Sequence, residues 1–294
     1  MKILIAGSSG LIGSSLKNFL QTGGHEVTSL LRREGDGVLW NPEQSELNLA
    51  DLEGYDVIIN LAGENLVSSR WSKNKKKRIR DSRVNSTKFL CESLKKLEKP
   101  PKVFLNASAI GYYGNVPDGN VSESQPAGEG FLSEVCQEWE AATECLMGED
   151  IRIVLLRTGV VLSPKGGALK SMLTPFKMGL GGVLGSGQQM MSWIDIDDLV
   201  RAIYFSINTD SIRGPINLTA PEPVNNRDFT KALGKALHRP TIFPMPAFLA
   251  RLVFGEMADE MLLSGAKVLP GKLEASRFEF NYPTIDASFK HLLP

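Results

Sequence analysis

The first 22 residues change from one hydrophobic pattern to another at a cluster of glycines. Ile3–Ala6 is a continuous apolar run, which is typical of a buried strand. After Gly7, apolar residues recur at the spacing of one helical face, at Leu11, Ile12, Leu16, Phe19 and Leu20. The pattern therefore predicts a strand, a tight turn and an amphipathic helix.

The same alternation of short apolar runs and helical patterns continues to about residue 162. The predicted strands are Val27–Leu31, Gly37–Trp40, the run from Tyr55 that enters a loop at Gly63, Val103–Ala107 and Ile151–Leu156. The predicted longer helices run from the basic segment near Lys73 towards Leu97, and from Gly130 to Met147. Because strands alternate with helices, and because the run from Tyr55 is nearly continuous in apolar residues, a parallel sheet covered by helices is predicted.

Three glycines in the first turn have the spacing of a dinucleotide-binding site. Gly7 permits the tight turn, Gly10 lets the backbone approach a pyrophosphate, and Gly13 lets the helix pack against the strand. The free N–H groups and the positive dipole end of the helix favour an anion there. A tight strand–helix turn without a ligand is the alternative. We predict that Gly7, Ser8, Ser9, Gly10, Leu11, Ile12 and Gly13 hold the phosphates of a dinucleotide.

The end of the second predicted strand bears on which dinucleotide binds. A site for NAD usually places Asp or Glu there to hold the ribose 2′-hydroxyl, whereas this strand ends in Arg32 and Arg33. An arginine pairs with a 2′-phosphate through its planar guanidinium. We therefore expect NADP(H), with Arg32 and Arg33 at the 2′-phosphate; a solvated basic turn is the alternative.

Further residues follow the run that begins at Tyr55. Leu61, Ala62 and Gly63 lie at the predicted carboxyl end of the sheet and are expected to line the cofactor. Arg83 reaches the same cleft if its helix packs beside this strand. Glu64 and Asn65 are either ligand contacts or loop residues that bond their own backbone.

The second part of the chain shows a different pattern. Beyond Ser163 glycine and methionine become frequent and regular alternation stops, before short strands at Trp193 and Ile216. Asp195, Asp197 and Asp198 are candidates to cap a helix over Leu199–Ile207. Asn225 or Asn226 is a candidate to cap a helix that extends to Leu237, and two further helices are predicted within residues 247–263. We predict an α/β protein with a Rossmann doubly wound sheet in residues 1–165. A smaller, mostly helical substrate-binding region is predicted in 166–294, with Trp193–Ile207 returning to the first domain.

Composition and charge narrow the class of protein. The 294 residues are 42% hydrophobic, and 33 basic residues balance 33 acidic ones, so nucleic-acid and membrane binding have no global electrostatic support. The basic segment Arg70–Arg80 contains a single aromatic residue and is expected to be a solvated helix face rather than an RNA site. Three unpaired cysteines, no predicted bilayer span and no room for a signal peptide favour a reduced, cytoplasmic protein. Three scattered histidines argue against a His-rich metal site.

The ordered motifs resemble a known group of enzymes. They are Gly7–Gly13, Asn60–Asn65, Arg80–Val84, Asn106–Gly114, Leu156–Leu162, Trp193–Asp198 and Gly255–Pro270 with Phe278, Phe280 and Tyr282. The chain is similar over its whole length to extended short-chain dehydrogenases/reductases, in particular to an atypical epimerase-like subgroup with a distinctive C-terminal segment. The resemblance implies that Ala107, Ser108 and Val160 flank the nicotinamide end, and that a small-molecule substrate lies between the two domains.

One departure from that superfamily affects catalysis. Its enzymes carry Tyr-x-x-x-Lys on the helix after the catalytic serine, and this chain contains no such motif. The register places Cys136 where the tyrosine belongs and Glu140 where the lysine belongs. Glu140 supplies no positive charge and would raise the pKa of a neighbouring thiol. The candidate catalytic residues are Ser108, Tyr112, Cys136 and Glu140, with Tyr113, Glu64 and Glu123 also within reach.

Each of these candidates has a structural alternative. Cys136 is otherwise a small buried hydrophobic residue, and Ser108 otherwise makes a structural hydrogen bond. We therefore expect either an NADP(H)-dependent, epimerase-like oxidoreductase of unidentified substrate, or a non-catalytic NADPH-binding sensor. The oligomeric state is not predicted.

Overall fold

The computed structural model describes residues 1–293, which form two compact units. The first unit consists of Met1–Ala109, Val135–Leu156 and Ile203–Ile216, and the second of Ile110–Glu134, Arg157–Ala202 and the chain from Asn217 onward. The units therefore interleave along the sequence. The domain boundary after residue 165 stays a prediction.

The first unit holds most of the elements that alternate in sequence. Those wholly within it are β1 (Lys2–Ala6), α1 (Leu11–Thr22), β2 (Glu26–Leu31), β3 (Val38–Asn41), β4 (Glu46–Leu47), η1 (Leu49–Leu52), β5 (Val57–Asn60), α2 (Lys73–Leu94), β6 (Val103–Ala109) and η3 (Glu144–Leu146). Four elements pass from one unit into the other: α3 (Phe131–Ala141), β8 (Arg152–Thr158), α5 (Ile196–Asn208) and β12 (Gly214–Leu218).

The second unit has shorter strands and more helices. Its elements are η2 (Ile110–Tyr113), β7 (Val116–Val121), β9 (Val160–Leu162), α4 (Gly167–Lys177), β10 (Met190–Met191), β11 (Trp193–Asp195), β13 (Val224–Asn225), α6 (Asn226–Ala236), α7 (Ala247–Phe254), η4 (Ala258–Leu262), β14 (Ala266–Val268), α8 (Gly271–Ala275) and α9 (Ile285–Leu292).

The central sheet has eight strands in the order β12-β8-β6-β5-β1-β2-β3-β4. β1 pairs in parallel with β2 and with β5, β5 with β6, and β2 with β3, whereas β3 and β4 are antiparallel. The chain leaves β1 towards β2 and later returns to β5 on the other side of β1. This reversal is the switch point at which doubly wound sheets bind ligands. The α/β, Rossmann-type prediction is confirmed.

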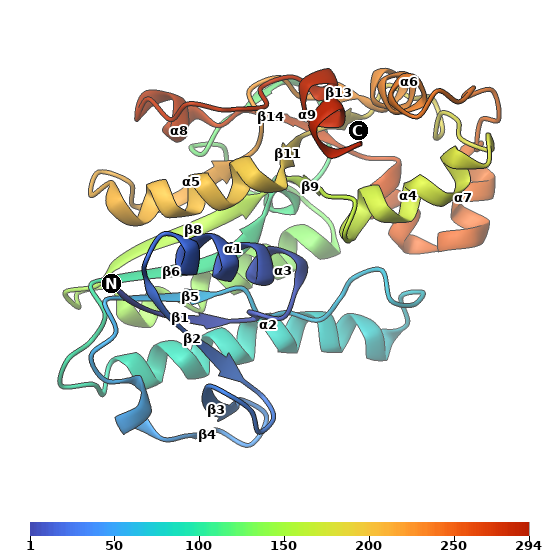
Figure 1. Cartoon of the computed structure of the whole chain (residues 1–294). Coiled ribbons are helices and arrows are strands. Elements are labelled where there is room, and N and C mark those ends of the chain that lie inside the picture. The colour runs from blue at the N-terminus through green and yellow to red at the C-terminus, as the bar shows by residue number, and fades with distance from the viewer. Residues whose placement is uncertain (294) are drawn as a thin grey trace. The chain divides into compact units, whose positions relative to one another are not determined.

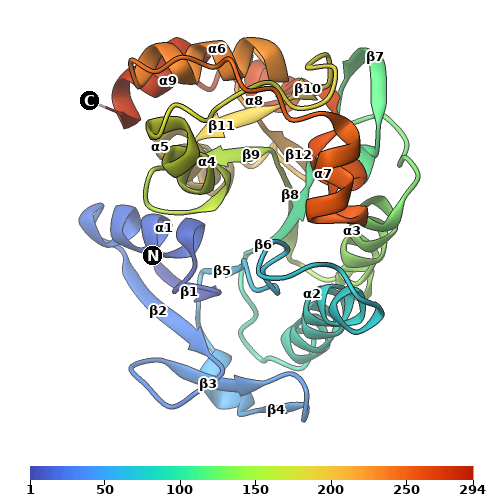
Figure 2. The ribbon, with the colours of Figure 1, turned by 90° about the vertical axis from the view of Figure 1, so that its right-hand side faces the viewer.

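Helices cover both faces of the strands in the first unit, as Figure 2 shows for α1 and α2. Successive strand residues point to opposite faces, so each strand contributes to two layers of core. Leu4, Ile58 and Phe104 pack with Leu90 and Leu94 of α2 in one buried cluster. This packing holds the C-terminal half of α2 against β1, β5 and β6.

In the second unit, α6 and α9 lie side by side (Figure 1). Phe229 of α6 and Phe289 of α9 meet edge to face, with their ring centroids 5.2 Å apart. Leu169 of α4 and the fully buried Trp193 of β11 belong to the same apolar cluster. The C-terminal helix therefore completes the core of this unit.

Several predicted elements differ from those observed. Residues 116–121 form β7, which pairs with β14, and Gly167–Lys177 forms α4; neither element is among those predicted from the sequence. The single helix predicted over Gly130–Met147 ends at Ala141 and is followed by the separate turn η3. The helix predicted from Leu199 begins at Ile196. As predicted, Asn225 caps α6, because its Oδ1 accepts a hydrogen bond from the Asp228 N–H.

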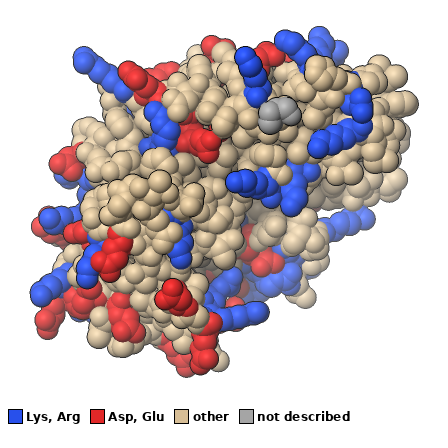
Figure 3. All heavy atoms as spheres, viewed as in Figure 1, with Lys and Arg blue, Asp and Glu red and all other residues tan. Residues whose placement is uncertain are grey.

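The charge of the surface and the length of the helices are relevant to whether the protein binds nucleic acid or a membrane. Figure 3 shows acidic and basic side chains scattered among uncharged residues, with acidic side chains most frequent at the lower left and basic ones along the upper right. Across residues 1–293, none of the helices combines the length and the apolar character needed to cross a membrane. Cys91, Cys136 and Cys145 are free thiols.

Candidate functional site

The turn between β1 and α1 contains two glycines that the protein's own packing requires. Gly7 has a φ of +77°, and a Cβ there would lie 2.7 Å from the backbone carbon and oxygen of Leu61. A Cβ on Gly13 would lie 2.2 Å from the Gly7 carbonyl oxygen. Backbone atoms this close leave no room for a methyl group, so both positions need glycine.

Gly10 differs from these two because nothing in the described chain crowds it. Its φ of −73° and ψ of 172° suit any residue, and a Cβ would meet only the Gly7 oxygen, at 3.4 Å. Gly10 is also the N-cap of α1, with no side-chain cap and no acidic residue in the first helical turn. The first-turn N–H groups and the positive helix dipole therefore remain available to an external anion.

The strand register brings the other predicted cofactor residues beside this turn. Ala6 is level with Leu30 of β2 and with Asn60 of β5, and Asn60 is level with Asn106 of β6. Gly7, Leu61 and Ala107 are therefore the next residues along three adjacent parallel strands. Their alignment places them together at the switch point.

Arg32 and Arg33 follow β2 on the opposite side of β1. Both side chains are exposed, and neither has a hydrogen bond or ion pair with any residue that the structure describes. An arginine that no protein carboxylate neutralises retains its full capacity to bind an anion.

Arg83 of α2 holds the loop that follows β5, residues 61–72. Its guanidinium donates to the carbonyl oxygens of Ile79 at 3.0 Å and Glu64 at 3.1 Å, and its Cζ lies 5.2 Å from the Trp139 ring centroid. Burial lowers the pKa of Arg83 below its ordinary value. A Cβ on Gly63 would lie 3.1 Å from Cζ of this guanidinium, so a larger residue there would press against Arg83. A bond from Arg83 to the cofactor stays a prediction.

A buried lysine fixes the same loop from the other side. Lys75 Nζ donates to Glu64 Oε1 at 2.7 Å, to the Asn65 carbonyl at 2.5 Å and to Ser68 Oγ at 2.6 Å. The hydrogen bond from Lys75 lowers the pKa of Glu64 despite the opposing effect of burial. Asn65 Oδ1 accepts from the Val67 N–H, which is the loop-forming alternative considered above.

The burial of the Lys75 side chain contradicts one prediction from the sequence. Its segment is predicted to be a solvated helix face, yet the Lys75 side chain is only 1% exposed. Its neighbours Lys77 and Arg80 do lie at the surface, where they pair with Asp81 and Glu138. Composition alone gives no signal that separates Lys75 from these neighbours, because only the fold of the loop turns it inward.

Ser108 and Glu140 meet inside the first unit. Ser108, near the carboxyl end of β6, donates its Oγ hydrogen to Glu140 Oε1 of α3 at 2.6 Å. Both residues are buried, at 4% and 8% exposure. Cys136 lies one turn earlier on α3 and is also buried. The structure thus brings Ser108 to Glu140 near the C-terminal end of α3, with Cys136 one turn away on the same helix.

A buried polar network aligns β5, β6, α2 and α3. The Asn60 side-chain amide donates to Thr87 Oγ1 at 2.9 Å and to Asn106 Oδ1 at 2.8 Å. The Trp139 indole N–H donates to the same Thr87 oxygen at 2.9 Å. Asn106 and Trp139 are close in sequence to Ser108 and Glu140, so the network fixes the elements that carry them.

Tyr112 and Val160 belong to the second unit. Tyr112 lies on η2 with its ring centroid 3.5 Å from Cζ of the buried Arg157. Its neighbour Tyr113 donates to Asn217 Oδ1 at 2.7 Å, and burial raises the pKa of the Tyr113 phenol. Val160 is paired with Trp193 between β9 and β11. Roles for Tyr112 in catalysis and for Val160 beside a nicotinamide remain predictions.

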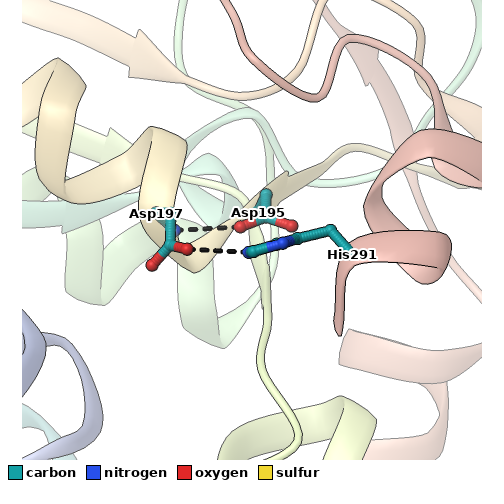
Figure 4. Close-up of side chains that lie close together, drawn as sticks. All are labelled: Asp195, Asp197 and His291. Carbon is teal, nitrogen blue, oxygen red and sulfur yellow. Dashed lines mark hydrogen bonds and ion pairs between the residues drawn. The ribbon is translucent and has the colours of Figure 1, made fainter. Parts of the chain in front are cut away.

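In the second unit, a cluster of titratable side chains connects the start of α5 to α9 (Figure 4). Its members are Asp195, Asp197 and His291. Asp195 Oδ1 accepts from the Asp197 N–H at 2.9 Å and Oδ2 accepts from Ser288 Oγ at 2.7 Å. Asp197 Oδ2 lies 2.8 Å from His291 Nε2, and Tyr282 stacks on the imidazole with 4.2 Å between centroids. Asp195 thus acts as the helix cap predicted from residues 195–198.

Asp195 should make the stability of the protein depend on pH. Burial raises the pKa of this carboxyl to about 6, so ionising it costs more in the folded than in the unfolded state. The resulting contribution to the free energy of unfolding should therefore fall by about 2–3 kcal/mol as pH rises from about 4 to about 6. Asp195→Asn, which retains a cap acceptor, should remove this fall in urea denaturation.

Asp286→Asn is the matched control for that measurement. Asp286 is exposed and pairs with the exposed Lys235. Its variant should keep the pH dependence of the unmodified protein. Parallel stability curves for Asp195→Asn and the unmodified protein would contradict the assignment.

The chain is similar to known proteins over most of its length. A model of the NAD dependent epimerase/dehydratase family matches residues 3–218, and a domain of unknown function, DUF1731, matches residues 245–292. The epimerase family protein MT2273 of Mycobacterium tuberculosis is 45% identical over 286 residues, which cover 96% of this chain and 94% of that protein.

Two solved structures share both sequence and fold with the chain. The crystal structure of human epimerase family protein SDR39U1 (isoform 2) with NADPH has a TM-score of 0.93 at 34% identity, covering 100% of this chain and 99% of that one. The nucleoside-diphosphate sugar epimerase from Corynebacterium glutamicum has a TM-score of 0.83 at 36% identity, covering 100% of this chain and 58% of that one.

Proposed function

Because the chain belongs to the NAD dependent epimerase/dehydratase family, we propose that it is an NADPH-binding, epimerase-like oxidoreductase acting on a small molecule. The cofactor would lie across the switch point, with its phosphates at the turn Gly7–Gly13 and its 2′-phosphate at Arg32 and Arg33. Leu61, Ala62 and Gly63 would line its path. When bound, it supplies a hydride or accepts one.

One observation carries the cofactor assignment. The N-terminus of α1 has neither a capping side chain nor a first-turn carboxylate, and Gly10 leaves it open to a ligand. Two unpaired arginines follow the adjacent strand, as a phosphorylated ribose requires. The human relative SDR39U1, which shares this fold over its whole length, was crystallised with NADPH.

Arg32→Glu should reverse the nucleotide preference. The change removes a charge-assisted hydrogen bond and places a carboxylate at the 2′-phosphate, so affinity for NADPH should fall about 10–100-fold. The affinity for NADH should stay the same or rise. Fluorescence titration of both nucleotides measures the two dissociation constants.

Lys88→Glu makes the same change of charge on the exposed surface of α2, near Glu92. It should leave both dissociation constants within about twofold, because screening weakens surface charges at a distance. If the unmodified protein prefers NADH, the assignment of Arg32 and Arg33 to the 2′-phosphate is wrong.

The missing Tyr-x-x-x-Lys motif favours a second candidate, a non-catalytic NADPH-binding sensor. Such a protein would bind the nucleotide and change its affinity for a partner. NADPH oxidation in the presence of aldehydes, ketones, quinones and nucleotide sugars separates the two functions. Turnover of one compound establishes an enzyme, and binding without turnover favours the sensor.

A further inference from the structure

We propose that Ser108 exchanges a proton with the substrate and that Glu140 is the group to which Ser108 passes it. The pair would replace the tyrosine and lysine that the superfamily uses. This inference rests on the proposed oxidoreductase function and adds to it the origin of the proton.

The geometry of the pair is that of a strong, direct hydrogen bond. The separation of 2.6 Å between Ser108 Oγ and Glu140 Oε1 lies in the range of a hydroxyl donating to a carboxylate. Both side chains are at least nine-tenths buried, so bulk water competes little for the bond. A proton can therefore move between the two oxygens without a bridging water.

The position of Ser108 relates the pair to the predicted cofactor site. Ser108 follows Ala107, which continues β6 one residue beyond the level of Asn60 in β5. It therefore lies at the same carboxyl edge as Leu61 and Gly7. Parallel sheets place their reacting groups at this edge.

The pair is also held rigidly. Thr87 of α2 accepts hydrogen bonds from Asn60 of β5 and from Trp139, the residue before Glu140. Thr143 Oγ1 donates to the Glu140 carbonyl at 2.8 Å and closes the end of α3. A proton-transfer pair needs supporting contacts of this kind, because small displacements weaken the transfer.

The step balances with these two residues and the proposed cofactor. In oxidation of an alcohol, the substrate O–H bond breaks and its proton goes to Ser108 Oγ, while the original Ser108 proton goes to Glu140 Oε1. The carbon–hydrogen bond breaks with both electrons, and that hydride goes to the oxidised nicotinamide. Reduction of a carbonyl reverses each transfer: Glu140 reprotonates Ser108 as Ser108 protonates the substrate oxygen.

Glu140→Gln tests the carboxylate with little change of shape. The variant should lower kcat about 10²–10³-fold, the usual size of a general acid–base contribution, while KM and the NADPH dissociation constant change less than threefold. Glu140→Asp should restore part of the rate, and Ser108→Ala combined with Glu140→Gln should lose no more than Ser108→Ala alone.

A measurement without turnover supports the same assignment. Infrared difference spectra between the unmodified protein and Glu140→Gln isolate the Glu140 carboxylate band. In Ser108→Ala the band should shift, because the hydrogen bond to Oε1 is gone. An unchanged band would overturn the pairing.

Glu138→Gln provides the matched control on the same helix. Glu138 pairs at the surface with Arg80, and its variant should keep kcat within about twofold. Failure of the unmodified protein to bind NADPH overturns the proposed function and this inference together. NADPH binding without turnover of any compound overturns the proposed oxidoreductase activity and, with it, this inference. An active Glu140→Gln, or one that loses rate only through loss of folding, overturns the inference alone and leaves the proposed function standing.

Discussion

Replacing Gly13 by alanine should destabilise the protein by about 2–3 kcal/mol and weaken NADPH binding at least tenfold. The new Cβ would lie 2.2 Å from the Gly7 oxygen and 2.8 Å from the Ser8 Cα, both backbone atoms that cannot rotate away. The better helix propensity of alanine offsets at most about 1 kcal/mol. Urea denaturation measures the stability, and fluorescence titration the affinity.

Gly10→Ala separates the two effects. Its Cβ meets only one atom, at 3.4 Å, and its backbone angles suit alanine, so the unfolding free energy should change by less than about 0.5 kcal/mol. The methyl group would nevertheless occupy the approach of the pyrophosphate, so NADPH affinity should fall at least tenfold. Normal NADPH binding by Gly10→Ala would show that the phosphates do not lie on this turn.

This contrast shows why the sequence predicts the nucleotide-binding half of the site. The strand, the three glycines and the helix are adjacent in sequence, and Gly7 and Gly13 are the two glycines that the packing of the turn requires. Parallel pairing then brings Gly7, Leu61 and Ala107 together once the strands are recognised, since strand carboxyl ends share one edge. Local pattern and general sheet geometry are sufficient there.

The missed elements depend on contacts that are distant in sequence. β7 contains Pro117 and Gly119, which favour a turn, and it becomes a strand by pairing with β14 about 150 residues later. α4 begins at a glycine and contains Pro175, so its sequence resembles a loop. Its buried leucines reveal a helix only when the cluster around Trp193 is assembled.

The chemistry around α3 was predictable only in part. Register with the superfamily places Glu140 at the lysine position, but the sequence does not show which group a carboxylate would contact there. The hydrogen bond from Ser108 depends on the packing of β6 against α3, which the Asn60 and Thr87 side chains fix. The residue type at position 140 therefore does not by itself show that Ser108 is the hydrogen-bond partner of Glu140.

Lys75→Met should destabilise the protein by about 2–3 kcal/mol and loosen the loop of residues 61–72. The variant leaves the Asn65 carbonyl, Ser68 Oγ and Glu64 without the ammonium that they share. Breaking a fully buried ion pair costs about 3–5 kcal/mol, but the Glu64 side chain is 32% exposed and regains water, which lowers the cost. Hydrogen exchange of the loop amides should accelerate in step with this loss.

The pH dependence of stability distinguishes lost charge pairing from lost packing. Lys75 lowers the pKa of Glu64 in the folded state, so this stabilisation is present above the unfolded pKa and is lost as pH falls through the folded one. In Lys75→Met, this acid-dependent loss of stability should be absent. Lys77→Met, on the same helix but with a 74% exposed side chain, should change stability by less than about 0.5 kcal/mol. Equal effects of the two variants would mean that the ammonium of Lys75 does not hold the loop.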